Sequence, residues 1–165
     1  MAPLAEENPA VIASEISLNV ASLVDITREF LPGMLASGRG ALVNVASTAA
    51  FQPIPGMAVY GATKAFVLSF TEAVAHETKA SGLRVLALCP GATRTEFFEV
   101  LGDESAAVGR LQSAGQVIDT ALRALDRDTT PPSVVSGWAN RVVAGLAQRL
   151  PRKVSLAIAG RAVQD

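Results

Sequence analysis

Two apolar runs, separated by a helix-length segment, constrain the possible folds of this chain more than any other feature. Residues 40–47 read GALVNVAS and residues 83–89 read LRVLALC, so both runs are almost continuously apolar. Strands that face solvent on one side alternate between apolar and polar residues, whereas strands buried on both faces do not. We therefore predict two strands of a parallel sheet that is covered on both faces, in an α/β fold.

Helical patterns alternate with these strands along the chain. A long amphipathic helix is predicted over residues 9–31, with its end near Pro32, and further helices are predicted at about 57–80 and 116–125. A short final strand is predicted at 131–137. The apolar stripe of the first helix comprises Ile12, Ile16, Val20, Leu23 and Ile26, and a core or subunit-contact face of the second comprises Phe66, Phe70 and Val74. This alternation of strands and helices favours a parallel sheet with crossover helices.

The predicted helix at 57–80 contains the residues that point most directly to chemistry. Tyr60 and Lys64 are four residues apart, and Ser47 lies thirteen residues before Tyr60. Residues i and i+4 of a helix share a face, with Cβ atoms about 5–6 Å apart, so the Lys64 ammonium favours the phenolate form of Tyr60. Ser47 adds a hydroxyl that can donate to a carbonyl oxygen or accept from an alcohol. The pattern predicts a proton-transfer site, although a Tyr-Lys pair by itself also occurs on many solvated helices.

Four motifs in this order resemble the C-terminal part of the classical short-chain dehydrogenase/reductase family. They are Asn19-Val20, the NVAS sequence at residues 44–47, Tyr60 with Lys64, and Pro90-Gly91 followed by Thr95. The resemblance extends from about Asn8 to about Ala144. It implies a Rossmann-like, doubly wound parallel α/β sheet with long flanking helices.

The resemblance also implies roles for individual residues. Tyr60 would be the general acid/base, and Ser47 would be the partner of the substrate carbonyl. Lys64 would lower the pKa of Tyr60 and bind the nicotinamide ribose, and Asn19 would hold a water in the proton relay. The implied cofactor is NAD or NADP, with NADP slightly favoured. The cofactor-binding residues implied by the resemblance are Tyr60, Lys64, Pro90, Gly91, Thr93 and Thr95.

The sequence departs from the family pattern in the nucleotide-binding half. That half has a strand, a Gly-rich turn and a helix whose N-terminus receives the dinucleotide pyrophosphate. No such turn occurs in this sequence, because Gly33 follows a proline at a predicted helix end while Gly38 and Gly40 open a strand. The NNAG motif and the acidic ribose-binding residue of the family are not found either. We therefore expect residues 1–165 to form a single domain, a partial Rossmann-like fold with its N-terminal strands missing.

Three functions from different classes are compatible with this sequence. The leading hypothesis is an NAD(P)-dependent oxidoreductase that interconverts a ketone and a secondary alcohol, with Tyr60 passing the proton. The alternative is an N-terminally truncated, catalytically silent relative that acts as an interaction module. A weaker hypothesis is a peripheral membrane protein that uses the basic amphipathic tail at 138–165, a segment for which a packed surface helix is the favoured interpretation. The resemblance implies a homo-oligomer that pairs through the helices carrying Asn19 and Tyr60.

The expected partner at the site is a small-molecule carbonyl or alcohol substrate. Residues 96–107 resemble the substrate loop of the family, and they contain the adjacent pair Phe97 and Phe98. These two rings could cover an apolar ligand or simply pack the loop. The identity of the substrate is not readable from either arrangement.

Composition and charge exclude several other classes. The formal net charge is −1 with both signs interspersed, so no nucleic-acid partner is expected. Cys89 is the only cysteine, which excludes an internal disulfide, and we interpret it as a buried strand residue in a reducing compartment. The only histidine, His76, is interpreted as a surface or packing residue, and no metal site is expected because no second His or Cys offers metal-ligand spacing. Glu72 is predicted on the solvated face of the same helix. The first residues do not resemble a signal peptide and no uninterrupted run of 18 apolar residues occurs, so the predicted location is cytoplasmic.

Overall fold

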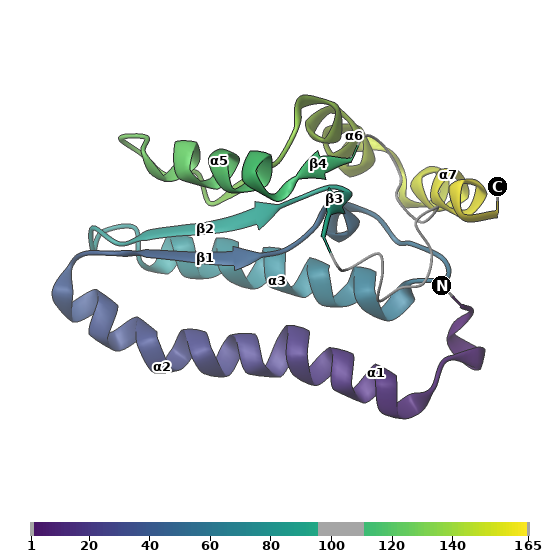
Figure 1. Ribbon diagram of the computed structural model, residues 1–165, viewed down its shortest axis with the longest axis horizontal. Helices are drawn as coiled ribbons and strands as arrows, with labels where there is room; N and C mark the ends of the chain where they lie inside the picture. Colours follow the sequence, from purple (N-terminus) through teal and green to yellow (C-terminus); the bar gives the residue numbers. More distant parts are fainter. Residues whose placement is uncertain (1, 96–110, 165) are drawn as a thin grey trace.

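Three parallel strands form the centre of the computed structural model, which describes residues 2–95 and 111–164 (Figure 1). Their order is β1 (Ala41–Val45), β2 (Arg84–Cys89) and β5 (Ser133–Val135), with β2 in the middle. Both strand pairs are parallel, with Val43 opposite Leu86 in the first and Leu88 opposite Val134 in the second. The prediction of a parallel sheet from the two apolar runs is therefore confirmed. The predicted burial of the first run on both faces is wrong, because β1 is an edge strand of the described sheet and its Val45 is 51% exposed.

Helices cover both faces of β2, which explains why its sequence is continuously apolar. The helix α3 (Ala58–Glu77) lies against one face, and α5 (Ala114–Leu125) lies against the other (Figure 1). Successive residues of β2 enter opposite clusters, because side chains along a strand point alternately to its two faces. The clusters on the α3 side contain Ala46, Val67, Leu68, Val74, Leu83, Val85, Ala87 and Cys89. The cluster on the α5 side contains Leu86, Leu88, Val117, Ala121 and Ala124.

One long helix runs beside α3 (Figure 1). It comprises α1 (Pro9–Ile16), a π-helical turn (Ser17–Ala21) and α2 (Ser22–Ser37). The prediction that it ends near Pro32 is wrong, because α2 continues through Pro32 and is capped by Gly38, which has a left-handed φ of 61°. Proline removes one backbone hydrogen bond, and the hydrogen bonds of the turns before and after Pro32 maintain the helix.

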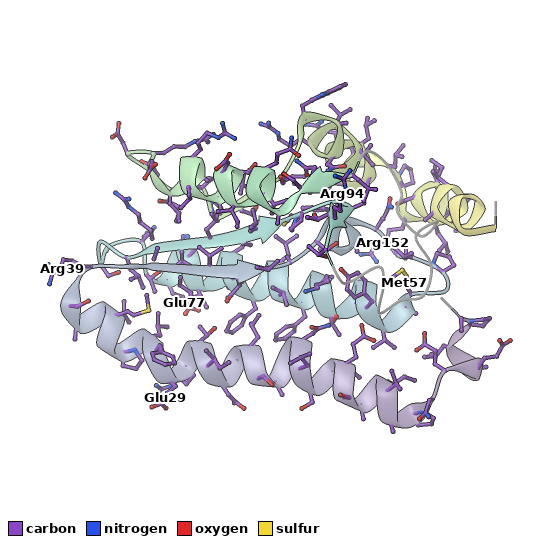
Figure 2. All side chains as sticks on the ribbon, viewed as in Figure 1. Glu29, Arg39, Met57, Glu77, Arg94 and Arg152 are labelled. Atoms are coloured by element: carbon purple, nitrogen blue, oxygen red, sulfur yellow. The ribbon has the colours of Figure 1, made fainter. Side chains whose placement is uncertain are left out.

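The inward face of this long helix differs from the predicted apolar stripe. Ile16 and Ile26 belong to the predicted stripe, yet they are 45% and 58% exposed. Ile12, Val20 and Leu23 of the predicted stripe are half-buried as expected. The other residues of this helix that are half-buried or buried are Glu15, Asn19, Ser22, Val24, Thr27, Leu31 and Met34. A π-helical turn has more residues per turn than an α-helix, so residues four apart stay aligned across it. Figure 2 shows side chains from this helix filling the space between it and α3.

The continuous helix Pro9–Ser37 is long and apolar enough to cross a membrane, judged by length and composition alone. It has 29 residues, although the sequence contains no uninterrupted run of 18 apolar residues. Core helices of soluble proteins and signal sequences meet the same criterion, so this helix by itself is weak evidence for a membrane span.

The remaining helices follow the predicted order. The predicted helix at 57–80 is α3, and the predicted helix at 116–125 is α5, which begins two residues earlier than expected. The start of α5 is fixed by a capping box, in which the side chains of Ser113 and Gln116 each accept from the other's backbone N–H. The predicted basic tail folds into α6 (Trp138–Arg149) and α7 (Arg152–Gln164).

Short elements complete the described chain. The strands β3 (Thr93–Arg94) and β4 (Gln112–Ser113) form a separate parallel pair. Two 3-10 helices occur at Leu4–Glu6 and Thr48–Phe51, and the second of them opens the segment that follows β1. The predicted substrate loop, with Phe97 and Phe98, lies outside the described residues.

Candidate active site

The carboxyl ends of β1 and β2 are tied together where the first site residue lies. The backbone N–H of Ala46 donates to the carbonyl of Leu88 at 2.8 Å, and the N–H of Thr48 donates to the carbonyl of Pro90 at 2.8 Å. Ser47 lies between them in extended conformation and caps the following 3-10 helix, its Oγ accepting from the N–H of Ala49 at 3.1 Å. Ligands of open parallel sheets bind outside the carboxyl ends of the strands, so Ser47 occupies the expected edge.

Tyr60 and Lys64 reach this same edge from the first turns of α3. The Lys64 Nζ lies 5.8 Å from the centroid of the Tyr60 ring and donates to the backbone carbonyl of Val45 at 3.0 Å. Both side chains are half-buried. The hydroxyl of Ser47 hydrogen-bonds with Tyr60, so the structure brings together all three residues of the predicted Ser-Tyr-Lys group.

The electrostatics of Tyr60 differ from the expectation based on its spacing from Lys64. The pKa of Tyr60 is raised, first by burial, which disfavours the phenolate, and further by the negative charge of Glu15. The hydrogen bond from Ser47 acts in the opposite direction and lowers the pKa. Burial also lowers the pKa of Lys64 below its ordinary value, while Glu15 raises it. The net direction at Tyr60 is thus opposite to the predicted one, because helical spacing does not report how far a side chain is removed from water.

Asn19 contacts the Tyr60 turn through an intermediate hydroxyl. Its Nδ2 donates to Oγ1 of Thr63 at 3.2 Å, and the same Oγ1 donates to the backbone carbonyl of Tyr60 at 2.8 Å. Asn19 lies within the π-helical turn Ser17–Ala21, a local distortion that occurs often at functional sites. The structure therefore holds Asn19 beside the Tyr60 turn, bonded to a neutral hydroxyl.

The segment after β2 contains side-chain hydrogen bonds to its own backbone and packs against α6. Thr93 Oγ1 donates to the carbonyl of Gly91 at 3.0 Å, and Thr95 Oγ1 donates to the carbonyl of Thr93 at 3.4 Å. A Cβ added at Gly91 would lie 2.4 Å from Nδ2 of Asn140, which donates to the carbonyl of Ser136 at 2.8 Å. The Asn140 side chain therefore packs closely against Gly91, and no local motif in the sequence indicates that contact.

The residues at this edge have functional groups of the kinds that bind one end of a dinucleotide. The ammonium of Lys64, the hydroxyls of Tyr60 and Thr95 and the backbone around Gly91 are suited to a ribose and a carboxamide. The sequence contains no Gly-rich turn for the phosphates, so the fit is limited to the nicotinamide-ribose end. Among residues 2–95 and 111–164, no three histidine, cysteine or acidic side chains are grouped so that they could hold a metal ion.

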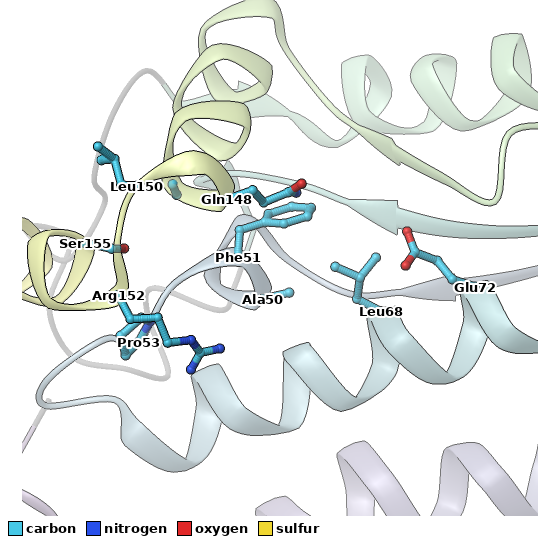
Figure 3. A pocket seen from close by; sticks show the side chains of 10 residues that line it. Ala50, Phe51, Pro53, Leu68, Glu72, Gln148, Leu150, Arg152 and Ser155 are labelled. Atoms are coloured by element: carbon cyan, nitrogen blue, oxygen red, sulfur yellow. The ribbon is translucent and has the colours of Figure 1, made fainter.

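A separate cavity of about 470 Å³ lies between α3, α6 and α7 (Figure 3). Phe51 and Leu68 give it an apolar wall, and Glu72 and Arg152 line it from different helices. Glu72, which is predicted on a solvated face, is half-buried and accepts a 2.6 Å hydrogen bond from the hydroxyl of Ser133. The Ser-Tyr-Lys group does not line this cavity.

Comparison with known families gives one match that covers most of the chain. The model of the family described as short chain dehydrogenase matches residues 1–106. This region includes the long helix, β1, α3, β2 and the segment after β2.

Curated relatives support the same assignment. The chain is 36% identical over 122 residues to an uncharacterized oxidoreductase, YvrD, of Bacillus subtilis, which covers 74% of this chain and 44% of that protein. It is 40% identical over 124 residues to a sulfoacetaldehyde reductase of Chromohalobacter salexigens, which covers 72% of this chain and 49% of that protein. The chain spans about half the length of the curated relatives that it matches.

Solved structures share the fold. A short-chain dehydrogenase from Sphingobium yanoikuyae in complex with NADPH is 32% identical with a TM-score of 0.73, covering 90% of this chain and 59% of that one. A short chain dehydrogenase from Burkholderia cenocepacia in complex with NADP is 25% identical with a TM-score of 0.78, covering 96% of this chain and 63% of that one. The partial, Rossmann-like parallel sheet with flanking helices is therefore an arrangement known from solved proteins.

Proposed function

The chain belongs to the short-chain dehydrogenase family, and from that premise we propose that it carries the proton-transfer site of an NAD(P)-dependent oxidoreductase. In this proposal the substrate is a small-molecule ketone or secondary alcohol, and the two forms are interconverted at a Ser-Tyr-Lys site. The observation that carries the proposal is the convergence of Ser47, Tyr60 and Lys64 at the carboxyl edge of the parallel sheet.

The proposed chemistry places the exchangeable proton on the phenolic oxygen of Tyr60. Its raised pKa keeps this group protonated near neutral pH, so it is ready to donate to the oxygen of a carbonyl substrate. The hydroxyl of Ser47 would donate to the same oxygen and stabilise the negative charge that develops there. In the reverse direction Tyr60 must first lose its proton, so alcohol oxidation would accelerate as the pH rises.

NAD or NADP would supply or accept the hydride at this site when bound. Lys64 and Tyr60 would contact its ribose, and Pro90, Gly91, Thr93 and Thr95 would line its nicotinamide. The solved relatives named above hold NADPH and NADP, which supports a slight preference for the phosphorylated cofactor. Asn19 is proposed to keep its place in the proton relay, since its amide lies one hydroxyl away from the Tyr60 turn.

A homo-oligomer is proposed to form through the long helix and α3. The outer face of the long helix exposes Leu18, Ile26 and Phe30, the last two at 58% and 64%. On α3, the exposed ring of Phe66 stacks on Phe70 with centroids 5.7 Å apart. Apolar side chains exposed together on neighbouring helices are typical of surfaces that pair with another molecule.

The experiment combines cofactor binding with turnover. NADPH and NADH are titrated separately while nicotinamide fluorescence is followed, and ketone reduction is then measured by loss of nicotinamide absorbance. Tyr60→Phe is expected to reduce turnover by about 10²–10⁴-fold, the usual contribution of a general acid, with the melting transition nearly unchanged. Lys64→Met is expected to weaken cofactor binding, and Lys79→Met serves as the matched control because Lys79 is exposed beyond the end of α3.

Two outcomes would contradict the proposal. Turnover retained by Tyr60→Phe would remove Tyr60 from the proton-transfer step. No binding of either cofactor up to millimolar concentration would favour the alternative function, a catalytically silent interaction module. Size measurement by light scattering on the same samples reports whether the chain forms the proposed homo-oligomer.

A further inference from the structure

The inward face of the long helix contains one acidic residue at the level of the proton-transfer site. Ile12, Glu15, Asn19, Leu23 and Thr27 face inward, and Glu15 is the only charged side chain among these five. Glu15 is half-buried, whereas its neighbours Ser14 and Ile16 are exposed. A charge in such a stripe acts more strongly than one in solvent, because the surrounding protein screens it less.

The position of Glu15 follows from the hydrogen bonds around it. It precedes Asn19 by four residues on the same inward face, and the Asn19 amide is bonded to Thr63 on α3 at 3.2 Å. Thr63 is adjacent to Lys64 in sequence, and its hydroxyl is bonded to the carbonyl of Tyr60 at 2.8 Å. Glu15 therefore lies one helical turn before Asn19, whose hydrogen bond to Thr63 holds the long helix against the Tyr60–Lys64 turn.

We propose that Glu15 is a positioning residue whose negative charge favours the neutral phenol of Tyr60 and the charged ammonium of Lys64, and so moves the proton exchange of this pair to higher pH. The electrostatic role does not require turnover, but its catalytic consequence rests on the proposed function. Ser47 stabilises the phenolate, so Ser47 lowers the pKa of Tyr60 while Glu15 raises it.

The contribution of Glu15 to each of two pKa values agrees with this role, while burial is the larger cause at both groups and lowers the pKa of Lys64 overall. Glu15 raises the pKa of Tyr60 and also raises that of Lys64, as a single negative charge near both groups must. The pKa of Glu15 itself is raised, first by burial and then by Glu7, and Lys64 lowers it. Glu15 from α1 and the neutral Ser47 after β1 both act on Tyr60, Glu15 also acts on Lys64, and Glu7 acts on Glu15.

The composition of the chain allows a direct test, because Tyr60 is the only tyrosine. Ultraviolet absorbance of the phenolate therefore reports the ionisation of this one residue, without any need for turnover. Glu15→Gln is expected to move the titration midpoint of Tyr60 to lower pH. Glu29→Gln is the matched control, since Glu29 is exposed on the outer side of α2 (Figure 2), and it should leave the midpoint unchanged.

Two further variants separate charge from shape. Glu15→Met removes the charge with an unbranched apolar side chain and should lower the midpoint as Glu15→Gln does. Glu15→Asp keeps a negative charge and should retain a midpoint closer to that of the parent. Circular dichroism at each pH restricts the comparison to folded protein.

A midpoint unchanged in both charge-removing variants, or shifted equally by Glu29→Gln, would overturn the proposal. The absorbance titration of Tyr60 does not depend on the proposed oxidoreductase activity. A lowered midpoint in a chain that binds no NAD(P)H would uphold the role of Glu15 and reject the function. In an active protein, Glu15→Gln should also shift the pH profile of alcohol oxidation to lower pH.

Discussion

The amide of Asn19 and the hydroxyl of Thr63 form a 3.2 Å hydrogen bond that joins the long N-terminal helix to α3. Thr63 is almost fully buried, and its hydroxyl also donates to the backbone carbonyl of Tyr60. This contact ties the long helix to the buried face of α3 beside the Tyr60 turn. Glu15, one turn before Asn19 on the same helix, acts electrostatically on both Tyr60 and Lys64.

The first prediction concerns the strength of this contact. Thr63→Val keeps the shape of the side chain but removes the hydroxyl, and Asn19→Ala removes its partner. A double-mutant cycle should give a coupling energy of about 0.5–1.5 kcal/mol, the usual net value of one hydrogen bond. Urea unfolding of the four proteins measures it. Ser14→Ala combined with Thr63→Val is the control pair, and their effects should add because Ser14 is exposed on the other side of α1.

The second prediction concerns Ser47 and Tyr60. The hydrogen bond from Ser47 lowers the pKa of Tyr60, so Ser47→Ala should raise the midpoint of the tyrosine absorbance titration. Ser69→Ala alters an exposed serine on α3 and should leave that midpoint unchanged. A midpoint that falls in Ser47→Ala would mean that Ser47 does not stabilise the phenolate.

The third prediction concerns the turn before β2. Gly82 has a φ of +79°, and a Cβ added there would lie 2.8 Å from the carbonyl oxygen of Gly38. Gly82→Ala should therefore destabilise the protein by at least ~1–2 kcal/mol, the strain of a left-handed backbone for an L-residue. Gly33→Ala is the matched control, because no atom lies within 4 Å of its added Cβ and the residue is helical. It should stabilise α2 by roughly 0.5–1 kcal/mol, and thermal unfolding compares the two.

The fourth prediction concerns the pH dependence of stability. Burial, and to a smaller extent Glu72, raises the pKa of the Cys89 thiol from 9.0 to about 12, and the side chain is 0% exposed. A raised pKa means that the unfolded chain loses this proton first, so stability is fully present below pH 9 and declines as the pH rises towards 12. The decline should be on the order of 1 kcal/mol per pH unit.

Urea unfolding at a series of alkaline pH values measures this slope. Cys89→Ala lowers stability at every pH through its cavity, but it should remove the contribution of the thiol to the slope. The Tyr60 contribution is common to both proteins and cancels in the comparison. Identical slopes would show that Cys89 does not titrate differently in the folded and unfolded chains.

Local patterns were sufficient for the central sheet and for the main site residues. The runs at 40–47 and 83–89 predict parallel strands, because continuously apolar strands are typical of parallel sheets. The predicted burial holds for β2 but not for β1, which lies at the edge of the described sheet. Ser47, Tyr60 and Lys64 were identified from spacing and order of motifs, and the structure places them together. Their catalytic and cofactor-binding roles, like those of Asn19, Pro90, Gly91, Thr93 and Thr95, remain predictions for the experiments above.

Other features depend on parts of the chain that are far apart in sequence. The helix continues through Pro32 and ends only at Ser37, before Gly38. Ile16 and Ile26 point outward, because a π-helical turn and packing on α3 override the simple periodicity. Glu72 is half-buried since Ser133 meets it from β5, and no pattern within α3 indicates this partner.

The sequence by itself determined the order of strands and helices, the burial of Cys89 and the positions of the Ser-Tyr-Lys group. These properties follow from periodicity and spacing, which are local. Only the tertiary structure decided that the pKa of Tyr60 is raised and that Glu15 acts on the Tyr60–Lys64 pair. Desolvation and Coulomb interactions depend on distances in space and on removal from water, and both are set by how the long helix, α3 and the end of β1 pack together.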